Sequence, residues 1–243
     1  MNKELFHSLC VKSFEQNGIS RLATDENVDK LYELSGVFSR AIAVMNLTAI
    51  KDEELMISRH FADCLIPEFL FLEGAKVLDV GSGGGMPTLP LAIARPDLHI
   101  TALDATEKKT RYISSAAEEL GLSNVSTITA RAEEAAHTSL RESFDCVTAR
   151  AVAELRILLE WCAPYIKVGG SFIALKGLRA DEELENAINA VEKLGLVLEK
   201  NESDTLIDLD GTESTRHTFV FKKVRKTPAL YPRKNAQIQK NPL

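Results

Sequence analysis

The sequence predicts an α/β fold in which a doubly wound, mostly parallel sheet follows a helical N-terminal extension. Three observations lead to this prediction. Apolar residues recur at helical spacing up to about residue 70, and from about residue 75 short β-rich runs alternate with helical stretches. Such alternation requires parallel strands joined by crossover helices. The link between the last two β-rich runs is short, which favours an antiparallel hairpin at one edge of the sheet.

The helical extension is expected to cover residues 1–70. The stretch "NVDKLYELSGVFSRAIAVM" has apolar residues at three- and four-residue intervals, and "MISRHFADCLIPEFLFL" repeats the pattern. Pro67 lies inside the second stretch and should break or kink its helix, because proline has no amide hydrogen to donate.

The sheet domain is expected to cover residues 71–225. Its helices should form the connections between parallel strands, and seven strands are expected along the chain. The expected helices are 88–95, 107–120, 153–166 and 181–194, and the expected strands are 75–80, 99–104, 125–129, 144–149, 170–175, 196–203 and 216–223. The remaining residues, 226–243, contain three prolines and are expected to form an extended basic arm.

Composition indicates an ordinary globular protein. The chain has 243 residues, of which 45% are hydrophobic and 26% charged. No apolar run approaches the roughly 18 residues that a membrane span needs, and the N-terminus does not resemble a signal peptide. The four cysteines are scattered without a C-x-x-C pair, so we expect reduced thiols, no metal site and a cytoplasmic location.

Charge is distributed unevenly along the chain. From Lys222 to the end there are seven basic residues and no acidic one. The residues before Lys222 therefore include 22 basic and all 35 acidic residues, which gives them a net charge of about −13. A basic tail on an acidic body is typical of a local contact with a polyanion. A tail that is merely solvated is the alternative that charge alone leaves open.

A glycine-rich loop follows the first strand in "VLDVGSGGGMPTLP", residues 77–90. Gly81, Gly83, Gly84 and Gly85 leave the backbone bare, so a ligand can lie against it. The lysine and Ser/Thr of a P-loop are absent, and Met86 occupies the place of the third glycine in G-x-G-x-x-G, so neither of those phosphate-binding patterns is matched. A plain tight turn remains the alternative.

Asp104 ends the second strand, 19 residues beyond Gly85. An acid at this distance from a glycine loop is placed to accept hydrogen bonds from the ribose hydroxyls of an adenosine. The alternative is that Asp104 caps the helix expected at 107–120.

Candidate residues also follow three other expected strands. Ala132 and Glu133 could flank an adenine ring or simply begin a solvated helix. Arg150 could hold an anionic or π-rich group, or pair with a neighbouring acid. Lys176 follows the fifth strand, where it could contact a ligand or be an ordinary surface lysine.

Two candidates lie in the helical extension. Asn46 in "NLT" could cap a helix or reach the site, and His60 in "RHF" could be structural or functional.

These residues together resemble a known family. "VLDVGSGGGMP" with Asp104 is similar to the S-adenosylmethionine loop of class I, Rossmann-like methyltransferases. From about Asn46 to the C-terminus, the chain resembles the bacterial 16S ribosomal RNA guanine-N7 methyltransferases, the RsmG (formerly GidB) family. That resemblance is carried by "NLTAI", "RHFADCL", "DVGSGGGMPTLPLAI", "RAEE", "RAVAEL", "LKG" and "YPRKNAQIQKNPL". The chain departs from the family at Met86, at Pro87-Thr88 and in "NAQIQ".

The resemblance implies an S-adenosylmethionine-dependent enzyme that methylates N7 of a guanine in 16S rRNA. Its substrate would be the 30S subunit or an assembly intermediate, and the enzyme would be a cytoplasmic monomer. The implied residues are Gly81, Gly83, Gly85, Met86, Asp104, Ala132, Glu133 and Arg150 for the cofactor, Asn46, His60 and Arg150 beside the target base, and Lys176, Arg225, Lys226, Arg233, Lys234 and Lys240 on the RNA.

Three other functions share some of these features. A methyltransferase for a small molecule or protein would keep the loop and Asp104 but would not need the basic tail. A non-catalytic module would bind S-adenosylmethionine or RNA without turnover. The spacing of the glycines and the expected final hairpin argue against a nicotinamide-dependent oxidoreductase.

Overall fold

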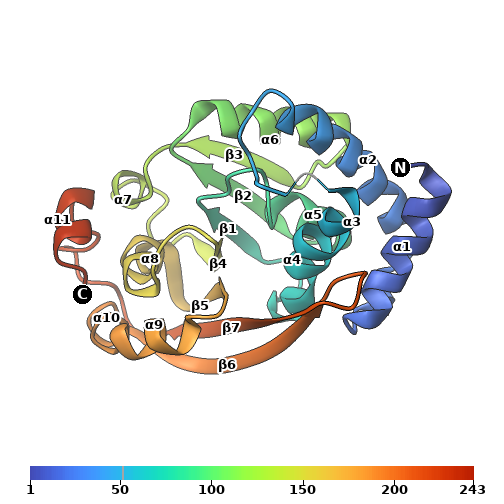
Figure 1. The fold of residues 1–243 in the computed structure, drawn as a ribbon. Coiled ribbons are helices and arrows are strands. Elements are labelled where there is room, and N and C mark those ends of the chain that lie inside the picture. Colours follow the sequence, from blue (N-terminus) through green and yellow to red (C-terminus); the bar gives the residue numbers. More distant parts are fainter. Residues whose placement is uncertain (51) are drawn as a thin grey trace.

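The computed structural model describes residues 1–50 and 52–243 and contains one seven-stranded sheet (Figure 1). Its strand order is β3-β2-β1-β4-β5-β7-β6. The strands are β1 (Lys76–Val80), β2 (His99–Asp104), β3 (Val125–Thr129), β4 (Phe144–Arg150), β5 (Ile166–Lys176), β6 (Leu196–Ile207) and β7 (Glu213–Lys223).

The directions of the strands confirm the predicted fold class. The first five strands pair in parallel, whereas β7 runs antiparallel to both β5 and β6. The expected edge hairpin is therefore present, with β7 inserted between β5 and β6. The order reverses beside β1, so the carboxyl ends of β1 and β4 flank the topological switch point where this fold binds ligands.

Helices cover both faces of the sheet. One side carries α5 (Thr88–Ala94) and α6 (Glu107–Glu119), and the other carries α7 (Ala132–Ala135), α8 (Leu155–Cys162), α9 (Ala180–Asn186) and α10 (Ile188–Lys193) (Figure 1). The helix expected at 181–194 is in fact two helices that meet at Ala187. The helix expected at 153–166 stops at Cys162, where Pro164 directs the chain into a short 3₁₀ turn.

The C-terminal arm differs from the expectation of an extended chain. It contains the short helix α11 (Asn235–Lys240), which packs against α8 (Figure 1). The stretch "NAQIQK" has neither proline nor glycine, and Ile238 is fully buried. Burial of this apolar side chain stabilises a helical turn that would be marginal in isolation.

The N-terminal extension is helical, as predicted. It comprises α1 (Lys3–Gln16), a 3₁₀ turn (Ser20–Leu22), α2 (Asp25–Ile42), α3 (Glu53–Met56), a π-helical stretch (Ile57–Ala62), α4 (Asp63–Leu65) and a second 3₁₀ turn (Ile66–Leu70). Asn2 and Thr24 cap α1 and α2 by accepting hydrogen bonds from backbone amides of their first turns. Pro67 lies in the last turn, where the α-helix ends as expected.

The extension shares its hydrophobic core with the sheet domain. Phe38 and Phe61 belong to the same buried cluster as Leu89 of α5 and Ile113 of α6. A second core on the opposite face joins β5 and β7 to α8 and α10. The extension is thus fixed against α5 and α6. Among the described residues, no helix is both long and apolar enough to span a bilayer.

Candidate active site

A cleft of about 330 Å³ opens at the carboxyl ends of β1, β2 and β4. Its lining comes from the glycine loop, from the ends of β2 and β4, and from the extension. The lining residues are Phe38, Leu47, Thr48, His60, Gly81, Ser82, Gly83, Gly84, Met86, Asp104, Lys109, Arg150, Ala151 and Val152. The cleft thus lies at the switch point that the strand order defines.

The glycine loop has a backbone that only glycine adopts readily. Gly81 and Gly85 have φ angles of +74° and +80°. A Cβ on Gly81 would lie 2.8 Å from the methyl groups of Val152, and one on Gly85 would lie 2.7 Å from Leu89 Cδ1. The bare backbone is therefore required both for the turn and for close packing behind it.

Asp104 joins the glycine loop to the start of α6. Its Oδ2 accepts a hydrogen bond from the Gly83 amide at 3.0 Å, and its Oδ1 accepts one from the Thr106 amide at 2.8 Å. The carboxylate therefore ties the loop to the residue that precedes α6, but it does not cap that helix, whose N-cap residue is Thr106. It also lines the cleft, so its remaining lone pairs can accept hydrogen bonds from a ligand.

A smaller cavity of about 200 Å³ adjoins the cleft. Gly81, Asp104 and Val152 line both, so the two are adjacent parts of one site with these residues at their boundary. Most of the smaller lining is apolar, and the predicted Ala132 and Glu133 belong to it. Trp161 of α8 and Asn235 of α11 complete the lining.

The donor set of this space fits the S-adenosylmethionine that the sequence implies. The apolar cavity suits a flat purine, Asp104 lies between the two parts, and the glycine loop lines the wider part. Ser82 lines that part too, and its hydroxyl has no hydrogen-bond partner among the described residues. It can therefore bind the polar amino-acid end of the cofactor.

Asp79 lies behind the loop and binds Thr88, the first residue of α5. Its Oδ2 accepts a hydrogen bond from Thr88 Oγ1 at 2.6 Å. Burial in this position raises the pKa of Asp79 to about 6, because the interior disfavours the ionised carboxylate.

Charged side chains from distant segments meet at Arg150. Asp63 accepts a hydrogen bond from Arg150 Nη1 at 2.8 Å and another from Arg216 Nε at 2.6 Å. Arg150 Nη1 also donates to the Arg59 carbonyl at 3.1 Å. The carboxylate of Asp63 therefore holds two guanidinium groups in fixed positions, one from β4 and one from β7.

The tautomer of His60 follows from its two partners. Arg150 Nη2 lies 3.3 Å from His60 Nδ1 and can only donate, so Nδ1 is the acceptor. The ring proton is then on Nε2, which lies 3.0 Å from Thr48 Oγ1. Burial and the nearby Arg150 charge lower the pKa of His60 to about 4, so the ring is neutral at pH 7.

Thr48 is left with a free donor by this arrangement. Its Oγ1 accepts from His60 Nε2 and also from the Ile50 amide at 3.0 Å. Because both acceptor positions are used, the hydroxyl hydrogen of Thr48 can point into the cleft.

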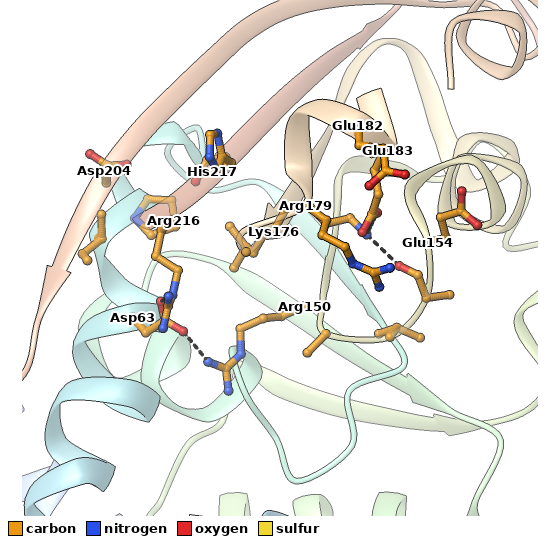
Figure 2. Close-up of a pocket in the computed structure, with 18 of the residues that line it drawn as sticks. Asp63, Arg150, Glu154, Lys176, Arg179, Glu182, Glu183, Asp204, Arg216 and His217 are labelled. Atoms are coloured by element: carbon orange, nitrogen blue, oxygen red, sulfur yellow. Dashed lines mark hydrogen bonds and ion pairs between the residues drawn. The ribbon is translucent and has the colours of Figure 1, made fainter. Parts of the chain in front are cut away.

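A larger, charged cavity of about 780 Å³ adjoins the cleft (Figure 2). Both are lined by Arg150, Ala151 and Val152, so this short segment separates them. Ala151 has a φ of +56°, an uncommon value for a residue with a Cβ. Figure 2 shows Arg216 and Arg150 on either side of Asp63, with Arg179, Lys176 and Glu183 at the other end of the cavity.

The structure brings most of the predicted residues together. Gly81, Gly83, Met86, Asp104, His60 and Arg150 line the cleft, and Ala132 and Glu133 line its continuation. Gly85 packs behind the loop against α5. Asn46 is exposed and does not line the cleft, although its neighbours Leu47 and Thr48 do.

The predicted RNA-contacting residues fall into two groups. Lys176 donates to Glu183 at 2.6 Å and Arg233 pairs with the buried Glu160 at 2.7 Å, so both have protein partners. The other four are Arg225, Lys226, Lys234 and Lys240, and all are exposed. Lys226 is near Glu142 at 3.8 Å, and Arg225 donates to the Glu192 carbonyl.

Sequence reasoning missed several residues of the site. Thr48 and Asp63 lie inside "NLTAI" and "RHFADCL", so their motifs were seen while their roles were not. Asn235 likewise lies inside "YPRKNAQIQKNPL" without having been singled out. Arg216 and Trp161 come from segments without a motif, and only the fold brings them to the cavities.

Comparison of the structure with solved structures agrees with this architecture. M. jannaschii TYW2 in complex with AdoMet superposes with a TM-score of 0.56 at 18% identity, over 75% of this chain and 80% of that one. A SAM-dependent methyltransferase from Aquifex aeolicus gives 0.52 at 18% identity, over 70% and 93%. At such identities the likeness concerns the fold.

Sequence comparison is more specific. The GidB profile, described as rRNA small subunit methyltransferase G, matches residues 26–205. A ribosomal RNA small subunit methyltransferase G from Clostridium beijerinckii is 40% identical over 242 residues, covering 98% of this chain and 99% of the relative. One from Lactobacillus delbrueckii is 44% identical over 206 residues, covering 82% and 84%. The chain therefore belongs to the GidB family, rRNA small subunit methyltransferase G, and is an S-adenosylmethionine-dependent methyltransferase.

Proposed function

We propose that this enzyme methylates N7 of a guanine in the 16S RNA of the small ribosomal subunit. Family membership supports the class of substrate. The observation that supports the N7 atom is the state of His60, which is neutral and has both ring nitrogens engaged by Arg150 and Thr48. The imidazole that faces the cleft is therefore an orienting group and has no free nitrogen to accept a proton.

Guanine N7 suits a site that orients its substrate in this way. N7 already presents a lone pair, so no proton has to leave before attack. S-adenosylmethionine, when bound, supplies a methyl group made electrophilic by its sulfonium. The protein must then hold N7 in line with that methyl, and positioning of this kind contributes on the order of 7–11 kcal/mol.

Thr48 is proposed to orient the base. Guanine O6 is an acceptor on the same edge as N7. The free hydroxyl hydrogen of Thr48 can donate to O6, while His60 and Arg150 fix the hydroxyl in place. A neutral imidazole also adds no positive charge beside a base that becomes cationic as it is methylated.

The charged cavity is proposed to receive the RNA backbone next to the target nucleotide. Arg150 belongs to both spaces, and Arg216 and Arg179 face the larger one (Figure 2). The guanine must be unpaired or extruded to reach the cleft, because the N7 edge lies in the deep, narrow groove of A-form RNA.

The exposed lysines of the arm are proposed to add phosphate contacts. Lys226, Lys234 and Lys240 are candidates because they are solvent-accessible, whereas contacts by Lys176 or Arg233 would have to compete with Glu183 or Glu160. The acidic body of the protein favours a ribonucleoprotein substrate, the 30S subunit or an assembly intermediate, over naked RNA. The enzyme is proposed to act as a monomer in the cytoplasm.

The test is to map the transferred methyl group. The enzyme is incubated with methyl-labelled S-adenosylmethionine and 30S particles that lack the modification, and the digested RNA is analysed by mass spectrometry. We expect 7-methylguanosine at one position of 16S RNA. Label on adenine, or on protein alone, would contradict the proposal.

A pair of Thr48 variants tests the orienting contact. Thr48→Val removes the hydroxyl at nearly constant volume and should lower kcat about tenfold, in keeping with one lost hydrogen bond. Thr48→Ser keeps the hydroxyl and should stay within about threefold of wild type. Equal losses in the two variants would show that packing of the Thr48 methyl, rather than donation to O6, is what the site needs.

A further inference from the structure

We propose that the C-terminal arm completes the cofactor site, with the Asn235 side chain accepting a hydrogen bond from the N6 amino group of adenine. This inference rests on the use of S-adenosylmethionine in the proposed function. It gives the arm a role in cofactor recognition that is separate from any contact with RNA.

The arm is fixed against α8 and the segment after α7 by a set of strong contacts. Arg233 donates to both carboxylate oxygens of Glu160, at 2.8 and 2.7 Å, and its backbone amide donates to the same group. Glu160 is fully buried on α8, so this pair is shielded from solvent and salt. The Arg233 charge therefore anchors the arm.

Backbone contacts fix the segment before Arg233 as well. Arg141 donates to the Tyr231 carbonyl at 2.9 Å, and His137 Nε2 lies 3.0 Å from the Pro232 carbonyl. Beyond Arg233, Ile238 is buried in the contact of α11 with α8. Asn235 lies between these anchors, so its position is set from both sides.

Two buried polar atoms, both of residues that line the cavity, have no hydrogen-bond partner within residues 1–50 and 52–243. They are Asn235 Oδ1, an acceptor, and Trp161 Nε1, a donor. Both residues line the same 200 Å³ cavity, whose other walls include Val80, Leu103 and Val152. Buried polar groups are nearly always paired, so this pattern indicates an occupant with its own donor and acceptor.

Adenine has that complementary pattern. Its exocyclic N6 amino group is a donor, and a ring nitrogen beside it is an acceptor. The flat ring fits the apolar walls, and the ribose would then reach Asp104, which lines both parts of the space. Hypoxanthine carries an oxygen in place of the amino group, so it would place an acceptor against the Asn235 oxygen.

This difference makes the contact measurable. Calorimetry in the absence of RNA compares the affinities of S-adenosylhomocysteine and S-inosylhomocysteine for the full-length protein. Wild type should bind the adenosyl compound at least tenfold more tightly. Asn235→Ala should reduce that ratio to about two, because the group that distinguishes the two bases is gone.

Two further variants complete the test. Asn235→Asp keeps an acceptor and should preserve most of the ratio. Gln237→Ala changes an exposed side chain of α11 that does not line the cavity, and it should leave both affinities unchanged. An unchanged ratio in Asn235→Ala overturns the inference, and so do equal losses for both compounds, which would show a purely structural role.

The same measurement separates this inference from the proposed function. A wild-type protein that discriminates between the two compounds through Asn235 but transfers no methyl to 30S particles would contradict only the proposed function. A protein that methylates guanine N7 but shows no Asn235-dependent ratio would contradict only the adenine contact.

Discussion

The two cavities that meet at Arg150–Val152 are built in different ways. The cleft beside the glycine loop, proposed to bind the cofactor, is formed mainly by main-chain turns at the ends of adjacent parallel strands, and much of it comes from one short stretch after β1. The charged cavity is formed by side chains from the extension, from β7 and from α9, which are far apart in the sequence (Figure 2).

This difference determines what each cavity can tolerate. The cleft depends on backbone conformations that only glycine adopts readily, so adding even one methyl group should disrupt it. The charged cavity depends on ion pairs such as Asp63 with Arg150 and Arg216, so removing one partner leaves an uncompensated charge. Substitutions in the cleft should therefore weaken cofactor binding, whereas substitutions in the charged cavity should lower turnover.

Gly81→Ala should have the largest effect. The new Cβ would lie 2.8 Å from Val152 in a backbone at φ +74°. Strain and overpacking together cost about 3 kcal/mol or more, so affinity for S-adenosylmethionine should fall at least 100-fold by calorimetry. Gly177→Ala is the matched control in the charged cavity, because its Cβ meets nothing within 4 Å. Similar losses in the two variants would remove the distinction between the cavities.

Asp63→Ala should have the next largest effect, and it should act on a different quantity. Arg150 and Arg216 would lose the carboxylate that holds them, so kcat should fall about 10- to 100-fold while cofactor affinity stays within about threefold. Asp97→Ala removes one of the two acidic partners of Arg95, away from both cavities, and should leave kcat nearly unchanged. A fall in cofactor affinity as large as the fall in kcat would contradict the comparison.

The same contrast explains how much of the site could be predicted from the sequence. The cleft could be located because Gly81 and Asp104 follow strands whose hydrophobic pattern is local, and parallel strands bring their ends to one edge. Arg150 could be placed in the same way because it ends a parallel strand, but its partners Asp63 and Arg216 could not. The distance between them in space depends on how the extension packs and on where β7 enters the sheet.

The fold shows the same limit. The strands and the edge hairpin were predictable from alternation and link length, but the helix of the arm was not. Its formation depends on burial of Ile238 against α8, a tertiary contact that overrides the weak local preference of a six-residue segment. Asn235 reaches the 200 Å³ cavity only because of that docking.

Replacing the exposed arm lysines should have a smaller effect, confined to the RNA. Lys234→Ala with Lys240→Ala should weaken binding to 30S particles about fivefold. It should also reduce the slope of log K against log salt by about 1.5, the value expected for two lost phosphate contacts. Cofactor affinity should not change. Lys200→Ala, an exposed site on β6, is the control and should leave the slope intact. An unchanged slope in the double variant would show that these lysines are merely solvated.

His60 should have the smallest effect on the pH dependence of turnover, because its pKa is lowered to about 4 by burial and by the Arg150 charge. The ring stays neutral between pH 6 and 8, so kcat should show no His60 titration in that range. The free energy of unfolding should instead depend on the titration of His60. The unfolded chain binds a proton below about pH 6.5, while the folded protein does not until about pH 4.

The contribution of His60 to stability is therefore complete above pH 6.5 and is lost as the pH falls towards 4. Between pH 7 and pH 5 this loss of stability amounts to about 2 kcal/mol.

Asp79 acts in the opposite direction, because its raised pKa stabilises the protonated, folded form at low pH. Urea unfolding of His60→Gln and Asp79→Asn at both pH values separates the two. His60→Gln should lose less stability than wild type on acidification, and Asp79→Asn should lose more. If His60→Gln loses as much as wild type, the imidazole is not neutral, and Nδ1 cannot be the acceptor of the Arg150 hydrogen bond.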